Sequence, residues 1–156
     1  MSDVPPPSFD PSRAWVARRA WSGVVDGVPS RIDFDLDASG RLRVVFDGRG
    51  SLAGAEALCA LVDAIRDEVG HSRPIEALVD MRKAGPAPLR AQVIVGRWLL
   101  GRKGQITRIA VFGGGKVEMA LARAVMTIAG MGQRAFFGAR LAEALAFLGF
   151  PADFHA

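Results

Sequence analysis

The stretch IEALVDMRKAGPAPLRAQVIVGRWLLGRK, residues 75–103, decides the fold class. It begins with a short apolar run, passes through a loop with two prolines, and ends in a helical segment that is apolar on almost every side. A short apolar run that is bounded by turn residues and followed by a helical pattern is typical of a parallel strand covered on both faces. The stretch therefore predicts a strand, a loop and a helix of an α/β protein.

The same arrangement recurs toward the C-terminus. The apolar runs RIAVF at 108–112 and QRAFFG at 133–138 precede helical patterns at 116–130 and 139–149. The second helical pattern stops at a glycine that is soon followed by proline, which is a common helix ending. Each run predicts a further strand of the same sheet, followed by a helix.

Toward the N-terminus the spacing of the apolar residues changes. RIDFDLDASGRLRVVFDG, residues 31–48, alternates apolar and polar side chains around a turn and predicts a β-hairpin. Its acidic side chains are expected to point to water; they are Asp33, Asp35 and Asp37. Residues 51–70 have one apolar face and predict a surface helix with Ser51 as N-cap and Gly70 at its end. From the hairpin onward the order is β-β-α-β-α-β-α-β-α.

The segment AWVARRAWSGVV, residues 14–25, predicts one more strand, with Trp15 and Trp21 on the same face because residues an even number apart share a side. The chain is divided as follows. We expect a disordered proline-rich arm at 1–12, an N-terminal extension at 13–30, one domain at 31–150 and a C-terminal tail at 151–156.

Composition limits the class of protein. Half of the 156 residues are apolar, enough for the core of one domain. The 20 basic and 16 acidic side chains are interspersed, which does not favour nucleic acid as a partner. No signal-peptide pattern and no apolar run of about 18 residues occurs in the sequence, so the expected location is the cytoplasm.

The element order, together with LVDMR, ITRIAVFG and AFFGARLAEALAFLG, resembles the SpoIIAA-like branch of the STAS superfamily, the sulfate transporters and anti-sigma factor antagonists. The resemblance covers roughly residues 30 to 150. It implies a mixed β-sheet of about 4–6 strands with helices packed mainly on one side. It also implies a module without catalysis that works by binding proteins, nucleotides or lipids.

In the anti-sigma factor antagonists that the chain resembles, the loop after the matching strand carries a serine that a kinase phosphorylates. Here the stretch reads DMRKAGPAPLRA, with Asp80 and Arg82 near the strand end and no Ser, Thr or Tyr before Thr107. The phosphoswitch therefore cannot be carried over to this sequence. We expect the loop to shape the entry to the next helix, with Pro88 in its first turn.

A glycine-rich turn offers a second kind of site. Gly113, Gly114, Gly115 and Lys116 lie between a predicted strand and a predicted helix, where backbone amides attract phosphate. A Walker A loop would need glycine at 110 and Ser or Thr at 117, and the dinucleotide pattern also fails. The turn is either a plain connector or the ligand loop of a domain that binds a small molecule or a nucleotide.

The remaining reactive side chains do not predict an active site. His71 and His155 have no partner at ligand spacing, so no metal site or catalytic triad is expected. Cys59 lies at the edge of an apolar helix face, where a small hydrophobe is expected rather than a nucleophile. Asp80, Arg82 and Glu118 are placed near strand ends, where charged groups are usually solvated or paired. No cofactor is predicted.

The helix at 89–103 has two apolar seams, and both cannot face the same sheet. One seam consists of Leu89, Val93, Gly96 and Leu100, and the second is centred on Ile94 and Trp98. In the helix at 116–130, the stripe Val117, Leu121, Ala124 and Ile128 is expected to face the core. The second seam is expected either to lie under the N-terminal segment or to be exposed.

If the second seam is exposed, it joins off-core methionines of the following helix in an apolar patch with a basic rim. The predicted contact residues are Ile94, Arg97, Trp98, Arg102, Met119, Arg123 and Met126. Their chemistry suits a protein partner, a second copy of the chain or an anionic membrane surface.

Overall fold

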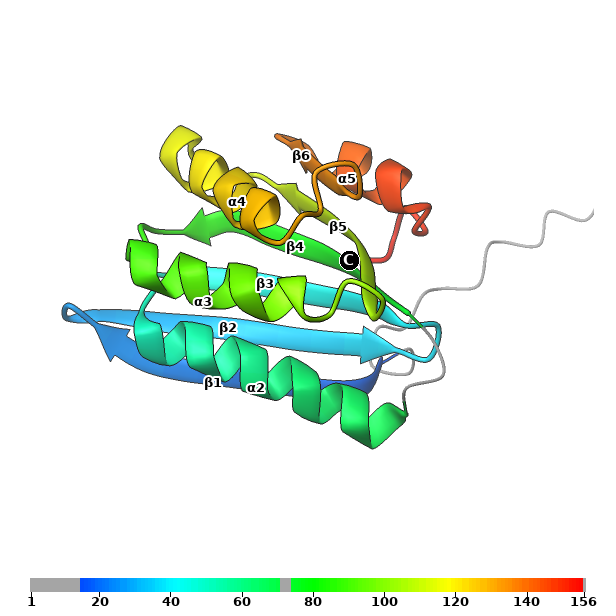
Figure 1. Ribbon diagram of the computed structural model, residues 1–156, viewed down its shortest axis with the longest axis horizontal. Coiled ribbons are helices and arrows are strands. Elements are labelled where there is room, and N and C mark those ends of the chain that lie inside the picture. The colour runs from blue at the N-terminus through cyan, green and yellow to red at the C-terminus, as the bar shows by residue number, and fades with distance from the viewer. Residues whose placement is uncertain (1–14, 71–73, 156) are drawn as a thin grey trace, which may run out of the picture.

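A computed structural model describes residues 15–70 and 74–155 (Figure 1). These ranges form one six-stranded mixed sheet and four helices, which confirms the predicted α/β class. The strands are β1 (Trp15–Val25), β2 (Val28–Asp37), β3 (Arg41–Gly48), β4 (Ile75–Ala84), β5 (Ile106–Phe112) and β6 (Ala135–Gly138). The helices are α2 (Leu52–Val69), α3 (Leu89–Leu100), α4 (Lys116–Ile128) and α5 (Leu141–Leu148). The arm predicted at 1–12 and His71 lie outside the described residues.

The strands follow one another across the sheet in chain order. β1, β2 and β3 pair antiparallel, whereas β3 to β6 pair parallel and are connected through helices. Helices α2, α3 and α4 cover one face of the sheet, and α5 with the C-terminal segment covers part of the other (Figure 1). The expectation that the helices pack mainly on one side is confirmed.

The sheet separates two apolar cores. Ala77 of β4 and Ile109 of β5 belong to the larger core under α2, α3 and α4. Their neighbours Leu78 and Ala110 belong to the smaller core on the α5 side. Because both faces of these strands are covered, their sequences are continuous apolar runs rather than alternating ones.

The two tryptophans of β1 do not share a face, so that prediction was wrong. Trp15 lies in the α5-side core, whereas Trp21 packs against the larger core. Trp15 pairs with Asp37 and Ala17 with Leu36, so two steps along β1 match one step along β2. This β-bulge shifts the alternation by one residue and sends the two indoles to opposite faces.

The acidic face of β2 is not fully solvated either. Asp35 is buried and accepts hydrogen bonds from Arg18 Nε and Arg43 Nη2, each at 2.8 Å. The Arg43 guanidinium lies 4.7 Å from the ring centre of Trp15, on the same side of the sheet. The alternating pattern identified the strand, but the expectation of water on this face was wrong for Asp35.

Most residues of the stripes expected to face the core in α3 and α4 are instead exposed; Gly96, which is buried, and Leu121, which lines the pocket, are exceptions. Leu89 is 69% and Val117 63% exposed, and Leu100 and Ile128 are exposed as well. The buried residues of the two helices are Ala91, Gln92, Gly96, Leu99, Val125 and Met126. Gly96 lies against α4, where a Cβ would come 2.9 Å from Cγ2 of Ile128. Both stripes are apolar, so periodicity alone could not select the inner one.

Candidate functional site

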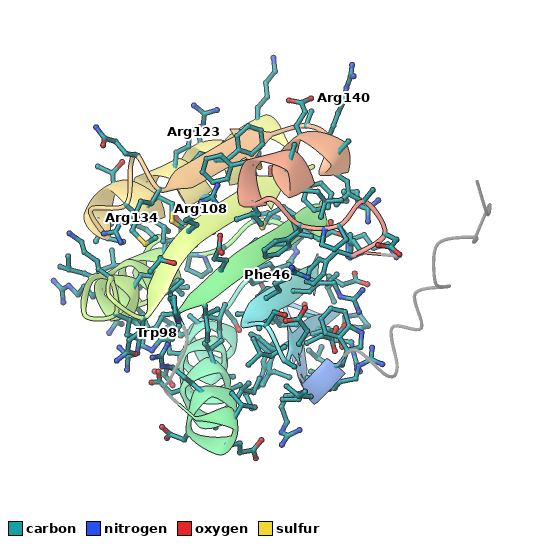
Figure 2. All side chains as sticks on the ribbon, turned by 90° about the vertical axis from the view of Figure 1, so that its right-hand side faces the viewer. Phe46, Trp98, Arg108, Arg123, Arg134 and Arg140 are labelled. Carbon is teal, nitrogen blue, oxygen red and sulfur yellow. The ribbon has the colours of Figure 1, made fainter. Side chains whose placement is uncertain are left out.

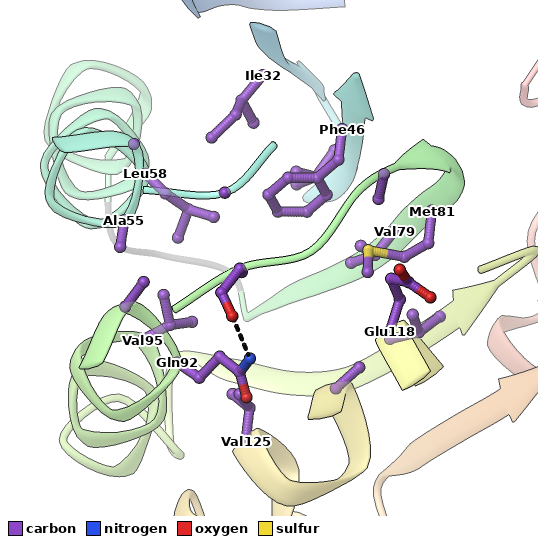
Figure 3. A pocket seen from close by; sticks show the side chains of 18 of the residues that line it. Ile32, Phe46, Ala55, Leu58, Val79, Met81, Gln92, Val95, Glu118 and Val125 are labelled. Carbon is purple, nitrogen blue, oxygen red and sulfur yellow. Dashed lines mark hydrogen bonds between the residues drawn. The ribbon is translucent and has the colours of Figure 1, made fainter. Parts of the chain in front are cut away.

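An apolar pocket with a volume of about 210 Å³ lies between the sheet and the layer formed by α2, α3 and α4. Strands β2 to β5 form its floor, and the three helices form its walls (Figure 3). Residues labelled there include Ile32, Phe46, Ala55, Leu58, Val79, Met81, Gln92, Val95, Glu118 and Val125. Few of the lining residues are polar, so the pocket suits a molecule that is mostly apolar.

Small side chains create this space. Gly54 and Ala55 of α2, Ala77 of β4, Ala91 of α3 and Ala122 of α4 all line the pocket. Protein interiors are normally close-packed, so alanine and glycine at facing positions leave volume that larger side chains would fill. The sequence signal was present as alanines on the helices, but it could not show that they face one another.

Two loops close the pocket at the carboxyl ends of β3 and β4. Gly50 N donates to Pro86 O at 2.9 Å, and Gly85 N donates to Gly48 O at 2.8 Å. Gly48 to Ser51 and several residues of the loop at 84–87 line the pocket. In α/β sheets, ligands bind beyond the carboxyl ends of the strands. The loop that contains Pro86 and Pro88 is thus part of a pocket wall as well as a connector.

Gln92 and Ser30 are buried polar residues in the pocket lining, and Gln92 comes from α3. Its side-chain Nε2 donates to Ala87 O at 3.2 Å (Figure 3). Its Oε1 is buried and accepts no hydrogen bond from the part of the chain that the structure describes. Glu118, in the first turn of α4, also lines the pocket and is partly exposed. Glu118 was expected near a strand end, whereas no sequence pattern singled out Gln92.

The glycine turn at 113–116 is packed against the protein. Gly113 has φ of +81° and donates its N–H to Gly138 O at 3.1 Å. Its Cα faces the Arg82 side chain, and the Glu118 carboxylate lies against Gly115. The positive end of the helix dipole at α4 therefore already has a carboxylate of this chain beside it. This arrangement favours the connector over a phosphate-binding loop, and nucleotide binding stays a prediction.

The predicted contact residues do not form one exposed patch. Met126 is only 7% exposed, and Met119 and Trp98 pack against the larger core. Trp98 Nε1 donates to Asp63 Oδ2 at 3.1 Å, and the Arg102 guanidinium lies 4.8 Å from the Trp98 ring centre. Figure 2 shows Trp98 between α3 and α2. The exposure expected for Met126 was therefore wrong, and Trp98 is half-buried.

The other predicted contact residues lie nearer the surface. Ile94 is half-buried, and Arg97 and Arg123 are exposed. Arg123 lies over Phe137, with 5.1 Å between its guanidinium carbon and the ring centre. A contact role for these residues stays a prediction.

A charged cluster lies on the α5 side of the sheet, away from the pocket. His155 Nε2 is 2.7 Å from Asp80 Oδ2, and Arg82 Nη2 donates to the same oxygen at 2.8 Å. Burial by itself raises the pKa of Asp80, but hydrogen bonds from Arg82 and His155 outweigh it and lower the pKa to about 2. The sequence did not indicate that His155 contacts Asp80, because the two residues lie 75 positions apart. The cluster anchors the C-terminal segment to the sheet.

Cys59 is not an activated thiol. Burial, and then the nearby Asp63 carboxylate, raise its pKa to about 11. A thiol with a raised pKa is a poor nucleophile near neutral pH, in agreement with the hydrophobic role expected for Cys59. Within residues 15–70 and 74–155, His, Cys, Asp and Glu form no cluster that could hold a metal ion.

Comparison with known proteins identifies the family. A family profile described as SpoIIAA-like matches residues 41–149. This chain belongs to the SpoIIAA-like family. The SpoIIAA-like domain contains β3 to β6 and all four described helices, so it includes most of the pocket lining. None of the curated proteins matches the chain.

Solved structures agree with the fold. A protein of the DUF3478 family with a SpoIIAA-like fold, from Shewanella loihica PV-4, has a TM-score of 0.54 and 16% identity. That match covers 85% of this chain and 94% of the other. The apo form of EndoMS matches with a TM-score of 0.32 and 15% identity over 57% of this chain and 38% of that one, too weak a likeness to carry an argument. Among the described helices, none has the length and hydrophobicity to span a bilayer.

Proposed function

We propose that this SpoIIAA-like protein is a binding module without catalysis that takes a small apolar molecule into the pocket under α2, α3 and α4. The observation that carries the proposal is a cavity of about 210 Å³ whose lining is nearly all apolar. For scale, an engineered apolar cavity of about 150 Å³ in another protein binds benzene. The amide of Gln92 and the partly exposed carboxylate of Glu118 are among the polar groups of the lining.

The test is a methyl NMR titration of the full chain with indole, a small apolar molecule. Methyl signals of pocket residues such as Ala55, Leu58 and Val95 should shift on saturation. Ala144 and Leu145, in the core on the other face of the sheet, serve as an internal control and should not move. Unchanged spectra, or equal shifts in both cores, would contradict binding in the pocket.

A second candidate function is contact with an anionic membrane, which was one of the partners that the sequence suggested. The observation that favours it is an apolar surface at the N-terminal ends of two neighbouring helices. Leu89 opens α3 and Val117 is the second residue of α4, and both are exposed. Arg90 directly follows Leu89, Lys116 directly precedes Val117, and both basic side chains are exposed. Apolar side chains beside basic ones suit insertion among anionic headgroups.

Liposome cosedimentation tests the second candidate. Wild type should sediment with vesicles that contain about 30% phosphatidylserine, and the double variant Leu89→Glu/Val117→Glu should stay in the supernatant, because charged side chains are costly to insert. Val24→Glu is the matched control, since Val24 is 74% exposed but lies in β1, outside the helix layer. If both variants bind vesicles as well as wild type does, this surface is not the membrane contact.

A further inference from the structure

The first strand of the sheet has an unpaired edge. β1 is the outermost strand, and within residues 15–70 and 74–155 it pairs only with β2 (Figure 1). It has 11 residues, whereas β6 at the opposite edge has four. A long edge strand offers a row of free N–H and C=O groups to another chain, and proteins usually avoid this with short, charged or proline-containing edge strands. The length of β1 therefore indicates a strand that pairs with something further.

The charges of β1 do not protect this edge. Arg18 Nε donates to Asp35 Oδ1 at 2.8 Å, and Arg19 Nη2 donates to Glu68 Oε2. Both arginines are thus paired with carboxylates of their own chain. β1 contains no lysine and no proline, and six of its 11 residues are exposed. The edge is therefore open, and its charges are already neutralised.

The turn between β1 and β2 determines which backbone groups face outward. Asp26 and Gly27 have φ of +51° and +76°, as in a two-residue type I′ hairpin turn. Val25 and Val28 flank this turn as a pair, and hydrogen bonding between them closes it. Bonded and non-bonded pairs alternate along antiparallel strands. The odd-numbered residues from 17 to 25 therefore bond to β2, and the N–H and C=O groups of residues 18, 20, 22 and 24 face the free edge.

A second copy of the chain fits this edge in a self-complementary register. A two-fold axis at Ala20 places Ala20 opposite its own copy and aligns the strand antiparallel over its full length. Arg18 then lies opposite the partner's Ser22, and Arg19 lies opposite the partner's Trp21. The outward groups of residues 18, 20 and 22 form three bonded pairs with roughly six hydrogen bonds. A typical protein interface has about 10 hydrogen bonds, so this ladder supplies a substantial share.

Charge favours this register over its neighbours. Arg19 and Trp21 lie on the α2 face of the sheet, and opposite side chains are closest in non-bonded pairs such as theirs. Arginines lie over the rings of Trp15 and Trp98, whereas none lies over Trp21 in the part of the chain that the structure describes. The partner's Arg19 would supply that cation. An axis at Arg19 would instead place two guanidinium groups directly opposite each other.

We infer that two copies of this chain associate through β1, antiparallel about a two-fold axis at Ala20, so that one sheet continues across both copies. The pairing also covers Val24, which is 74% exposed and comes to lie against the bulge that contains the partner's Val16. The inference goes beyond the proposed function, because it concerns an edge of the sheet and not the binding of a small molecule. The sequence suggested a second copy as a partner, but on the helices at 89–103 and 116–130.

Charge variants at the axis test the inference on the full chain by analytical ultracentrifugation. Ala20 is exposed and faces its own copy, so Ala20→Glu and Ala20→Lys each bring like charges together. Either variant alone should raise the dimer dissociation constant about fivefold, which corresponds to about 1 kcal/mol. A mixture of the two places opposite charges at the axis and should restore the wild-type constant or lower it.

Ala124→Glu and Ala124→Lys are the matched controls, because Ala124 is an exposed alanine on α4. They should dimerise as wild type does, both alone and mixed. A wild-type chain that is still monomeric at about 1 mM overturns the inference. So do Ala20 variants that associate as wild type does, and so does a mixture that associates no better than either variant alone.

Amide hydrogen exchange in wild type keeps the inference testable if the variants do not fold. The outward amides of Arg18, Ala20 and Ser22 should exchange fast in the monomer and become protected as the dimer forms, whereas those of Arg19 and Trp21 should be protected throughout. A dimer without protection of the outward amides would place the contact elsewhere, such as on α3 and α4. Protection of these amides in the monomer would show that another segment of the chain occupies the edge. Either result overturns the inference.

Discussion

Filling the pocket should stabilise the protein and abolish ligand binding together. Ala55 on α2 and Ala122 on α4 line the pocket from different helices. Replacing either by leucine adds three carbon atoms, and burial of each contributes about 0.8 kcal/mol, or about 2.4 kcal/mol in all. Leucine is nearly as good a helix former as alanine, so the backbone contributes little. Allowing for imperfect fit, we expect the free energy of unfolding to rise by about 1 to 2 kcal/mol.

Urea unfolding without ligand measures this change, and indole titration measures its consequence. Ala144→Leu is the matched control, because Ala144 also lies on a helix but is fully buried in the close-packed core on the α5 side. Overpacking there should cost about 1 to 3 kcal/mol and leave indole binding in place. If Ala55→Leu and Ala122→Leu both destabilise as much as Ala144→Leu does, the pocket has no room for a ligand and the reasoning is refuted.

Three further predictions concern the rest of the molecule. The pKa of Asp80 is lowered from 3.8 to about 2, so its ionised form stabilises the fold above pH 3.8 and loses that effect as pH falls toward 2. Asp80→Asn should therefore lower the free energy of unfolding, measured with urea, by about 2 kcal/mol more at pH 6 than at pH 2. A loss of stability that does not depend on pH would contradict this. Trp98→Phe removes the hydrogen bond to Asp63 and should lower the free energy of unfolding by about 1 kcal/mol. Trp98→Glu places a second carboxylate beside Asp63 and should unfold the protein, which circular dichroism would show. Kinases that act on STAS domains should leave residues 80–106 unmodified in phosphopeptide mapping, since this span has no Ser, Thr or Tyr.

Local pattern was sufficient to predict the order of elements. The runs that became β4 and β5 are apolar because both faces of these strands are covered, and their flanking turn residues mark their ends. Ser51 caps α2 as expected, with its Oγ accepting from Gly54 N at 3.0 Å. Strand and cap signals depend on neighbours within a few residues, which a sequence displays directly.

Features that depend on distant neighbours could not be predicted in this way. The bulge after Trp15 arises from pairing with β2, and the burial of Asp35 depends on arginines from two neighbouring strands. The partner of His155 lies in a strand 75 residues earlier. Each of these residues has an ordinary local sequence, so only the assembled sheet shows what surrounds it.

The two apolar sides of α3 explain both the error in assigning its face and the function we propose. A helix that only covered a sheet would need one apolar stripe, and a second apolar stripe exposed to water would be unfavourable. In α3 the inner side carries Ala91 and Val95 beside Trp98 and Leu99 and leaves space above the sheet unfilled, whereas Leu89 and Leu100 are exposed on the outer side. Exposed leucines on the outside and unfilled space on the inside are the reverse of what stability alone favours. The pocket and the exposed stripe are therefore best explained together, as parts of a module that binds apolar molecules.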